Sequence, residues 1–159
     1  MALDTTAFRH ALAHFGSGVT VVTMAHNGER SGLTVSAFCS LSLNPPYILV
    51  CIDKSSNTLG LVRAAKCFAV NILSEEQITL SNHFASKLPD KLDSIPFRDG
   101  TLGSPLLDGA LANLECRLAN EVDGGDHMIL FGEVMETHVD ESKSPLLYFT
   151  GHYGKFHSI

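Results

Sequence analysis

The sequence contains no tryptophan and is poor in basic residues. Its 159 residues include 11 Lys plus Arg against 17 Asp plus Glu, which gives a formal net charge of -6. The basic residues are scattered singly, so the positive patch that binding to a phosphate backbone requires is missing. The first 15 residues mix Arg9 and histidines with apolar residues and match neither a signal peptide nor a membrane span. We therefore expect no nucleic-acid partner, no membrane association and a cytoplasmic location.

Cysteine is also scarce, and its spacing argues against two kinds of chemistry. The four cysteines are Cys39, Cys51, Cys67 and Cys116, and no two of them form a CxxC pair. This separation speaks against a zinc knot and against thioredoxin-type redox chemistry. Cys51 and Cys67 lie within apolar runs, where a thiol behaves as a small hydrophobic group. We expect reduced cysteines that pack in the core, and we assign no chemical role to Cys39.

Low-complexity tracts are absent, and the composition is that of a folded domain. Hydrophobic residues make up 45% of the sequence, which is enough to form one sizeable core. Charged residues make up 18%. A chain of this length is typical of a single domain. We therefore expect one domain that spans residues 1–159.

Helical periodicity is found in the first 15 residues. Phe8, Leu12 and Phe15 recur at helical spacing and share one face. His10 and His14 fall on the opposite face, at the spacing of two metal ligands on a helix. This pair lacks the glutamate of an HExxH pattern and a third ligand. We expect both histidines to face solvent, and we expect no metal site.

Strand composition dominates the rest of the chain. Runs typical of strands occupy residues 18–25, 32–38, 47–52, 67–73, 111–122 and 128–139. Asn27-Gly28 is a strong hairpin signal, and a second turn is expected at 123–126. The run 47–52 follows a loop that ends at Pro45-Pro46, and its continuous apolar character fits a strand buried on both faces.

Two further segments predict helices. Residues 55–66 offer Ser and Asn caps ahead of a short helical pattern. Ser74 to Gln77 match the capping-box pattern S-x-x-E/Q, which predicts a helix from there to about Ala85. Residues 86–109 contain three prolines and three glycines and predict a long surface loop, with room for one helical turn.

Short strands joined by hairpin signals, with few helices, predict a mainly antiparallel β-barrel or sandwich. Strands that are apolar on both faces also need a cover on their outer side. Helices or a second subunit can supply that cover. For a domain this small with so much two-faced strand, we favour a homodimer.

A group of hydroxyl side chains follows Gly32 in an otherwise strand-like stretch. Thr34, Ser36, Ser40 and Ser42 lie two or four residues apart and therefore share one strand face. They are either the polar side of an ordinary strand, or groups that hold a phosphate or the polar edge of a planar heterocycle. The residues by themselves leave both interpretations open.

Several motifs in order along the chain resemble one family. The run GLTVSAFCSLSLNPPYILVCI at 32–52 closely resembles the flavin reductase-like family, which has an FMN-binding split-barrel fold. Further segments resemble the family's first strand, its phosphate-side turn, its element after a helix and its nicotinamide-side motif, at 15–23, 54–58, 84–86 and 125–127. The resemblance spans about residues 8–156. It is closest to the small reductase components of two-component monooxygenases, of the 4-hydroxyphenylacetate 3-monooxygenase type.

The resemblance implies a mainly β fold, an antiparallel, Greek-key-like split barrel with a few peripheral helices. It also implies an NAD(P)H:flavin oxidoreductase that transfers hydride from NADH or NADPH to FMN or FAD and supplies reduced flavin to a partner monooxygenase. The sequence has no Rossmann GxGxxG, which is consistent with a nicotinamide folded against the flavin. Two alternatives remain: a reductase of another acceptor, such as a corrinoid or ferric complex, and a flavin-binding protein without turnover.

The same resemblance implies a set of cofactor-binding residues. They are Gly32, Leu33, Thr34, Val35, Ser36, Ala37, Cys51, Asp53, Lys54, Ser55, Asn57, Thr58, Phe84, Ala85, Ser86, Lys87, His127 and Tyr153. Residues 34–37 are implied to line the isoalloxazine, and residues 51–54 to lie by the ring or the ribityl chain. Ser55, Asn57 and Thr58 precede a predicted helix, whose N-terminus suits a phosphate; ordinary capping is a compatible role.

The remaining implied residues also have ordinary roles that the sequence allows. His127 is implied to lie near the nicotinamide and to position it, whereas a histidine beside a turn is otherwise an ordinary exposed residue. Ser86 and Lys87 are implied to add a hydroxyl and a charge, and the alternative for Lys87 is a solvated loop lysine. Tyr153 either packs over the cofactor or closes one end of the barrel.

Overall fold

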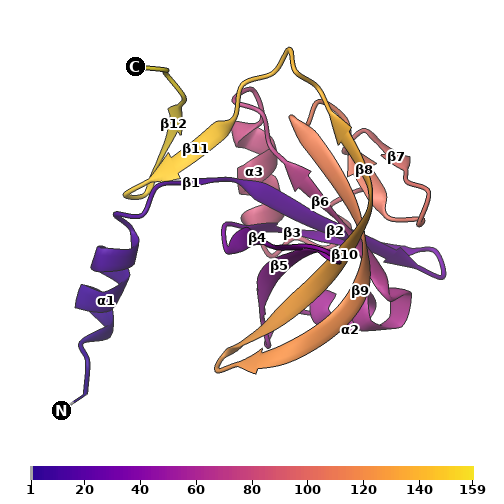
Figure 1. Cartoon of the computed structure of the whole chain (residues 1–159), viewed down its shortest axis with the longest axis horizontal. Helices are drawn as coiled ribbons and strands as arrows, with labels where there is room; N and C mark the ends of the chain where they lie inside the picture. The colour runs from indigo at the N-terminus through magenta and orange to yellow at the C-terminus, as the bar shows by residue number, and fades with distance from the viewer. Residues whose placement is uncertain (1) are drawn as a thin grey trace.

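Seven strands form one antiparallel sheet, which is the body of the molecule (Figure 1). The computed structural model describes residues 2–159. In spatial order the strands are β3 (Glu29–Val35), β2 (Thr20–His26), β6 (Cys67–Ile72), β9 (Ala112–Gly124), β10 (His127–Val139), β5 (Pro46–Asp53) and β4 (Phe38–Leu43). The edge strands β3 and β4 are consecutive in the chain, with only residues 36–37 between them, so the sheet curls until its edges approach each other. The expected antiparallel, mainly β fold is confirmed.

Three helices and five short strands surround this sheet. They are α1 (Thr5–Leu12), α2 (Thr58–Ala65), α3 (Ile78–Ala85), β1 (Ser17–Gly18), β7 (Phe97–Asp99), β8 (Pro105–Leu107), β11 (Leu146–Phe149) and β12 (His152–Lys155). β1, β11 and β12 form a small sheet, and β7 pairs with β8. Figure 1 shows α1 and the β11–β12 hairpin standing away from the barrel. Within residues 2–159, no helix has the length and apolar character needed to cross a membrane.

Two apolar clusters hold the fold together. The first fills the inside of the curled sheet and is covered by α2; Val50, Phe68 and Leu130 are fully buried there. The second packs α3 and the segment that follows it against the barrel, and it includes Val21 and Phe84. Burying each such side chain contributes roughly 1.5–3 kcal/mol. These clusters fix the position of α2 and α3 relative to β3.

Both predicted hairpin turns are confirmed. Asn27 and Gly28 have φ of 50° and 82°, the left-handed pair that matches the twist of a two-residue hairpin between β2 and β3. Gly125 has φ of 88° in the turn between β9 and β10. Because glycine has no Cβ, it adopts this conformation without steric cost. The second turn brings the start of β10 beside the end of β5.

The segment after the first hairpin differs from the prediction. The expected strand 32–38 ends at Val35, and the expected loop before Pro45 contains strand β4. β4 pairs with β5, with Phe38 opposite Val50. Cys39 and Ser40 are exposed and Ser42 is partly buried, and these side chains concealed an edge strand whose backbone pairs on one side only. Residues 36–37 form the link at which the chain passes from one edge of the sheet to the other.

The run 47–52 is not buried on both faces, as its composition predicted. Ile48, Val50 and Ile52 are fully buried in the barrel, whereas the odd-numbered residues between them are only half buried. Both faces are buried instead in β2, where residues 20–24 are all buried, and in β6, where residues 68–71 are all buried. An apolar run alone therefore did not show which strand has a cover on its outer side.

The predicted capping box at Ser74 forms only in part. The side chain of Gln77 accepts a bond from the Ser74 N–H at 3.0 Å, as a capping box requires. The Ser74 hydroxyl donates instead to the Gly109 carbonyl at 3.0 Å. Residues 74–77 close a turn, so α3 begins at Ile78 and ends, as predicted, at Ala85.

Residues 86–109 are not a surface loop throughout, which corrects the prediction. The segment contains the β7–β8 hairpin, and Leu92, Leu106 and Leu107 are buried. Its prolines and glycines mark the turns, while the leucines between them pack in the core. The apolar stretches are too short to show a periodicity in the sequence.

The cysteines occupy different environments. All four are free, and only Cys116 is fully buried. Burial raises the pKa of Cys116 to about 12 and also raises the pKa of Cys51. Cys39 is exposed. The expectation of core thiols is therefore correct for Cys116, and only partly so for Cys51 and Cys67.

Candidate functional site

A cavity of about 750 Å³ opens between β3, the N-terminus of α2 and the segment that follows α3. Ten of the residues predicted from the sequence line it: Leu33, Thr34, Asp53, Ser55, Asn57, Thr58, Phe84, Ala85, Ser86 and Lys87. Eight others line it without having been predicted: Glu29, Arg30, Ser31, Ser56, Leu88, Pro89, Asp90 and Lys91. Its volume falls within the range of about 300–1,000 Å³ that is typical of small-molecule sites.

The N-terminus of α2 supplies the polar end of this cavity. The Ser56 hydroxyl accepts a bond from the Thr58 N–H at 3.3 Å and lies 2.7 Å from the Thr58 hydroxyl, so the cap is Ser56, and Asn57 makes no side-chain capping bond. The hydroxyl and N–H of Ser55 both donate to Asp53 Oδ1 at 2.7 Å. These two bonds lower the pKa of Asp53. A helix N-terminus with backbone N–H groups and positive dipole suits an anion such as a phosphate.

The apolar wall of the cavity depends on Gly32. A Cβ at Gly32 would lie 2.8 Å from Cε1 of Phe84, so only glycine lets this ring pack against β3. Phe84 in turn lines the cavity. Next to it, the Thr34 hydroxyl donates to the Ser81 carbonyl at 2.7 Å and ties β3 to α3. The Thr34 hydroxyl is thus already engaged within the protein.

Lys91 adds a cation that sequence reasoning missed. Its ammonium donates to the carbonyls of Phe84 at 3.0 Å and of Gly32 at 3.4 Å, and burial lowers its pKa. Lys87, which was predicted, also lines the cavity but is exposed. The Ser86 hydroxyl donates to the His83 carbonyl at 2.6 Å. No local motif marks Lys91, because the buried packing of the segment after α3 brings it to the cavity.

His127 lies one strand away from the cavity, at the β9–β10 turn. It pairs in register with Asp53 at the end of β5, and its Nδ1 lies 2.6 Å from Asp126 Oδ1. Lys54 holds the turn in place: its N–H donates to the Asp126 carbonyl at 2.9 Å, and its ammonium donates to Asp123 at 2.6 Å. The bond from Lys54 lowers the pKa of Asp123. Neither Lys54 nor His127 lines the cavity itself.

The structure does not bring every predicted residue to the cavity wall. Gly32 lies behind it, and Val35 is buried at the end of β3. Ser36 and Ala37 are exposed in the link between β3 and β4, and Cys51 is half buried on β5. None of these residues lines the cavity.

Tyr153 also lies outside the cavity lining. Its hydroxyl donates to Asn82 Oδ1 at 2.8 Å and lies 2.9 Å from the Ser81 hydroxyl. Tyr148 packs edge-on against its ring, with the centroids 5.3 Å apart. In this arrangement Tyr153 fastens β12 to α3.

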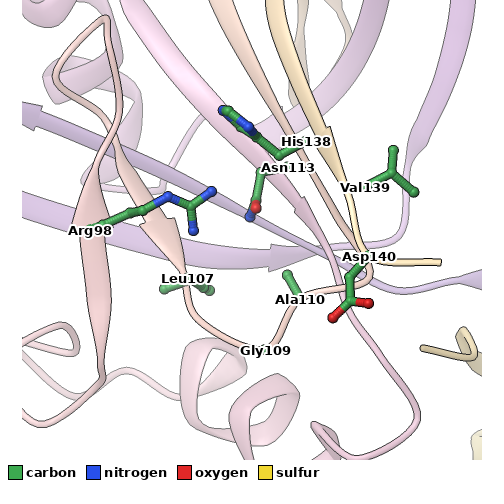
Figure 2. A pocket seen from close by; sticks show the side chains of 8 residues that line it. All are labelled: Arg98, Leu107, Gly109, Ala110, Asn113, His138, Val139 and Asp140. Carbon is green, nitrogen blue, oxygen red and sulfur yellow. The ribbon is translucent and has the colours of Figure 1, made fainter. Parts of the chain in front are cut away.

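A second, smaller cavity of about 230 Å³ lies near β7 and the far end of the β9–β10 ladder (Figure 2). It is lined by Arg98, Leu107, Gly109, Ala110, Asn113, His138, Val139 and Asp140. None of the residues predicted from the sequence contributes to it. The first cavity is therefore the candidate cofactor site.

Comparison with known proteins identifies the family of the chain. Residues 12–157 match the family model described as flavin reductase like domain. The chain is 40% identical over 153 residues to the flavin-dependent monooxygenase reductase subunit HsaB of Mycobacterium tuberculosis, covering 95% of this chain and 82% of that protein. It is also 40% identical over 147 residues to the 4-hydroxyphenylacetate 3-monooxygenase reductase component of Thermus thermophilus, covering 92% and 93%.

A solved structure shares the fold over nearly the whole chain. It is the Streptomyces globisporus C-1027 NADH:FAD oxidoreductase SgcE6 in complex with NAD and FAD fragments, with a TM-score of 0.92, 34% identity, and coverage of 97% of this chain and 93% of that one. The family expected from the motifs is thereby confirmed. The chain belongs to the flavin reductase-like family.

Proposed function

We propose that this chain is an NAD(P)H:flavin oxidoreductase that supplies reduced flavin to a separate monooxygenase, with the cavity beside β3 and α2 as its flavin site. Reductase components of monooxygenases are among its relatives, matched over 82% and 93% of their length. The assignment of the flavin site rests on one observation. Residues from three separate motifs line the same cavity: the segment after Gly32, the turn before α2 and the end of α3.

The cavity has the donors that a flavin nucleotide requires. The N-terminus of α2, with its neighbouring serine and threonine hydroxyls, faces the cavity and suits the phosphate. Phe84 and Leu33 provide apolar surface for a planar ring, and Lys91 places a positive charge beside it. Stabilising developing negative charge with a fixed cation is most effective in such a partly enclosed site.

The protein's task in this reaction is to hold geometry. When both cofactors are bound they supply the hydride-transfer chemistry themselves, so the site needs no nucleophile from the chain. His127 stands beside Asp53 at the cavity edge and is our candidate for positioning the nicotinamide. Its bond to Asp126 and the Lys54 contacts fix the backbone on which it sits.

The proposal includes a homodimer in the cytoplasm. Apolar side chains on α1 and on the outer side of β4 are exposed in the single chain, and a second copy is the cover that we infer for them. The four cysteines are free, which suits a reducing compartment.

Anaerobic stopped flow tests the activity directly. The full chain is saturated with FMN or FAD and mixed with NADH or NADPH, and the visible flavin absorbance is followed. We expect rapid bleaching, and ultrafiltration afterwards should recover reduced flavin in the filtrate. An unchanged spectrum would identify a flavin-binding protein without turnover. Faster reduction of a corrinoid or ferric complex than of free flavin would identify another acceptor.

A further inference from the structure

Glu115, Glu136 and His138 form a compact group at the end of the β9–β10 ladder that lies far from His127. A bulge after Val134 places Glu136 directly opposite Glu115, and His138 lies two residues further along the same strand, on the same face. One ligand atom from each of the three residues lies within 4.8 Å of the others. The ladder thus presents two carboxylates and one imidazole to a single point.

The charges of this group are not balanced by the described protein residues. Glu115 is only 1% exposed, and its Oε1 has no hydrogen-bond partner within residues 2–159. The basic side chain within ion-pair distance is His138, whose Nε2 lies 3.7 Å from Glu115 Oε1 and 3.6 Å from Glu136 Oε1. Like charges directly opposite each other on neighbouring strands repel, and a buried unpaired carboxylate is costly. A bound cation would relieve both effects.

The carboxylates are held so that one oxygen of each is free to bind. Glu115 Oε2 accepts the Leu102 N–H at 2.9 Å, and Glu136 Oε2 accepts the Thr101 hydroxyl at 2.7 Å. Both Oε1 atoms therefore face His138, and the loop before β8 orients them from behind. Outer contacts of this kind orient the ligands of metal sites.

The spacing fits a zinc-sized ion. Zinc binds nitrogen and oxygen ligands at about 2.0–2.2 Å in tetrahedral geometry, which places neighbouring ligand atoms about 3.4 Å apart. The two distances to His138 Nε2 are 3.6 and 3.7 Å. His138 also lines the small cavity in Figure 2, where its ring points away from Asp140. The side chains of His138 and Glu136 are 38% and 42% exposed, so the group is open to solvent.

We propose that Glu115 Oε1, Glu136 Oε1 and His138 Nε2 bind one divalent transition-metal cation, with zinc as the best match, and leave a fourth position for water. None of the three residues lines the candidate flavin cavity. The ion joins β9 and β10 to the loop that contains Thr101 and Leu102, so its role is to stabilise this end of the barrel.

Calorimetric titration with zinc chloride tests the site. The full chain is purified, freed of any affinity tag and treated with chelator, and it carries His10→Ala and His14→Ala so that the helical histidine pair cannot bind zinc. We expect one zinc per chain and a rise in melting temperature with excess zinc, as for any ligand that binds the native state. Cobalt should give the visible absorption of a tetrahedral site.

Single variants in that background locate the ion. Glu136→Gln and His138→Gln, both at partly exposed positions, should weaken zinc binding at least tenfold and abolish the rise in melting temperature. Glu133→Gln is the matched control on the same strand, because its carboxylate contacts Arg117 and lies outside the group. The absence of stoichiometric zinc binding would overturn the proposal. So would binding that is unchanged in the Glu136 and His138 variants.

Discussion

At the scale of single residues, the hydroxyls near the cavity differ in whether the protein already uses them. Thr34 donates to the Ser81 carbonyl and Ser55 donates to Asp53, so both have structural partners. Ser36 is exposed in the link between the sheet edges. The two interpretations that the sequence left open therefore apply to different residues: a structural role to Thr34, and a candidate binding role to Ser36.

This division predicts that one substitution mainly weakens flavin binding, whereas the other mainly lowers the stability of the fold. Ser36→Ala should weaken flavin binding roughly fivefold at unchanged melting temperature, since one neutral hydrogen bond contributes about 1 kcal/mol. Thr34→Val should lower the free energy of unfolding by about 1 kcal/mol, because the Ser81 carbonyl loses its donor, with a smaller effect on flavin. Fluorescence titration and thermal melting measure the two quantities. Equal flavin affinity in Ser36→Ala and wild type would assign Ser36 to the ordinary surface.

Lys91 and Lys87 form a matched pair for testing the charge in the cavity. Lys91→Met should weaken FMN binding about tenfold, since a hydrogen bond to a charged group contributes roughly 1.5–3 kcal/mol. Lys87→Met should change it less than threefold, because an exposed charge is screened by solvent and contributes about 0–1 kcal/mol. Titrations at low and high salt check both. A larger loss in Lys87→Met than in Lys91→Met would contradict the assignment.

His127 is tested by separating binding from the rate of hydride transfer. His127→Ala should keep flavin affinity and melting temperature near wild type, because the side chain does not line the cavity. Single-turnover reduction should fall roughly 10- to 100-fold, the scale expected when reacting atoms are misplaced by about 1 Å. Because positioning needs no proton transfer, we expect the reduction rates of the variant and of the wild type to depend on pH in the same way. A wild-type rate in the variant would make His127 an ordinary exposed residue.

At the scale of elements, the sequence predicted the presence of turns, helices and strands better than the residues at which they begin and end. Hairpin turns with Asn-Gly and Gly-Gly are local signals, and both were correct. The start of α3 was misplaced because a distant carbonyl, that of Gly109, takes the Ser74 hydroxyl. β4 was missed because a cysteine and two serines interrupt its apolar residues. Such features depend on partners remote in sequence, which no local pattern encodes.

The same distinction explains which site residues were predictable. The turn before α2 and the end of α3 carry continuous motifs, and their residues line the cavity as expected. Lys91 reaches the cavity through the packing of an irregular segment. Glu115 and His138 come together only because β9 and β10 pair with a bulge. The sequence therefore predicted no metal ligands there.

Gly32 tests the packing of α3 against β3. Gly32→Ala should lower the free energy of unfolding by about 1–3 kcal/mol, because the added Cβ meets the buried Phe84 ring and overpacks the core. Displacing Phe84 should also weaken flavin binding. Gly60→Ala is the control within α2: nothing lies within 4 Å of its Cβ position, and it should stabilise the helix by about 1 kcal/mol. Chemical denaturation measures both, and equal stability of Gly32→Ala and wild type would show that Phe84 can move aside.

At the scale of the whole molecule, the single chain leaves apolar surface without a cover. Phe8, Leu12 and Phe15 are 48%, 57% and 81% exposed, and Leu43 at the end of β4 is 95% exposed. α1 has eight residues, none of them buried. Isolated helices shorter than about 12–15 residues are marginal in water. We infer that a partner surface keeps α1 folded, and in the proposed homodimer that surface is a second copy of the chain.

Light scattering of the purified chain tests this inference. We expect twice the mass of one chain at micromolar concentration. Phe8→Asp combined with Leu12→Asp should shift the mass toward that of one chain and reduce the helical signal, because charges on the apolar face of α1 cannot be buried without partners. His10→Ala, on the opposite face of the same helix, should leave the dimer intact and so controls for the helix itself. A wild-type chain that stays monomeric at this concentration would contradict the homodimer. A dimer that persists in the double variant would move the interface away from α1, toward the outer face of β4 and β5.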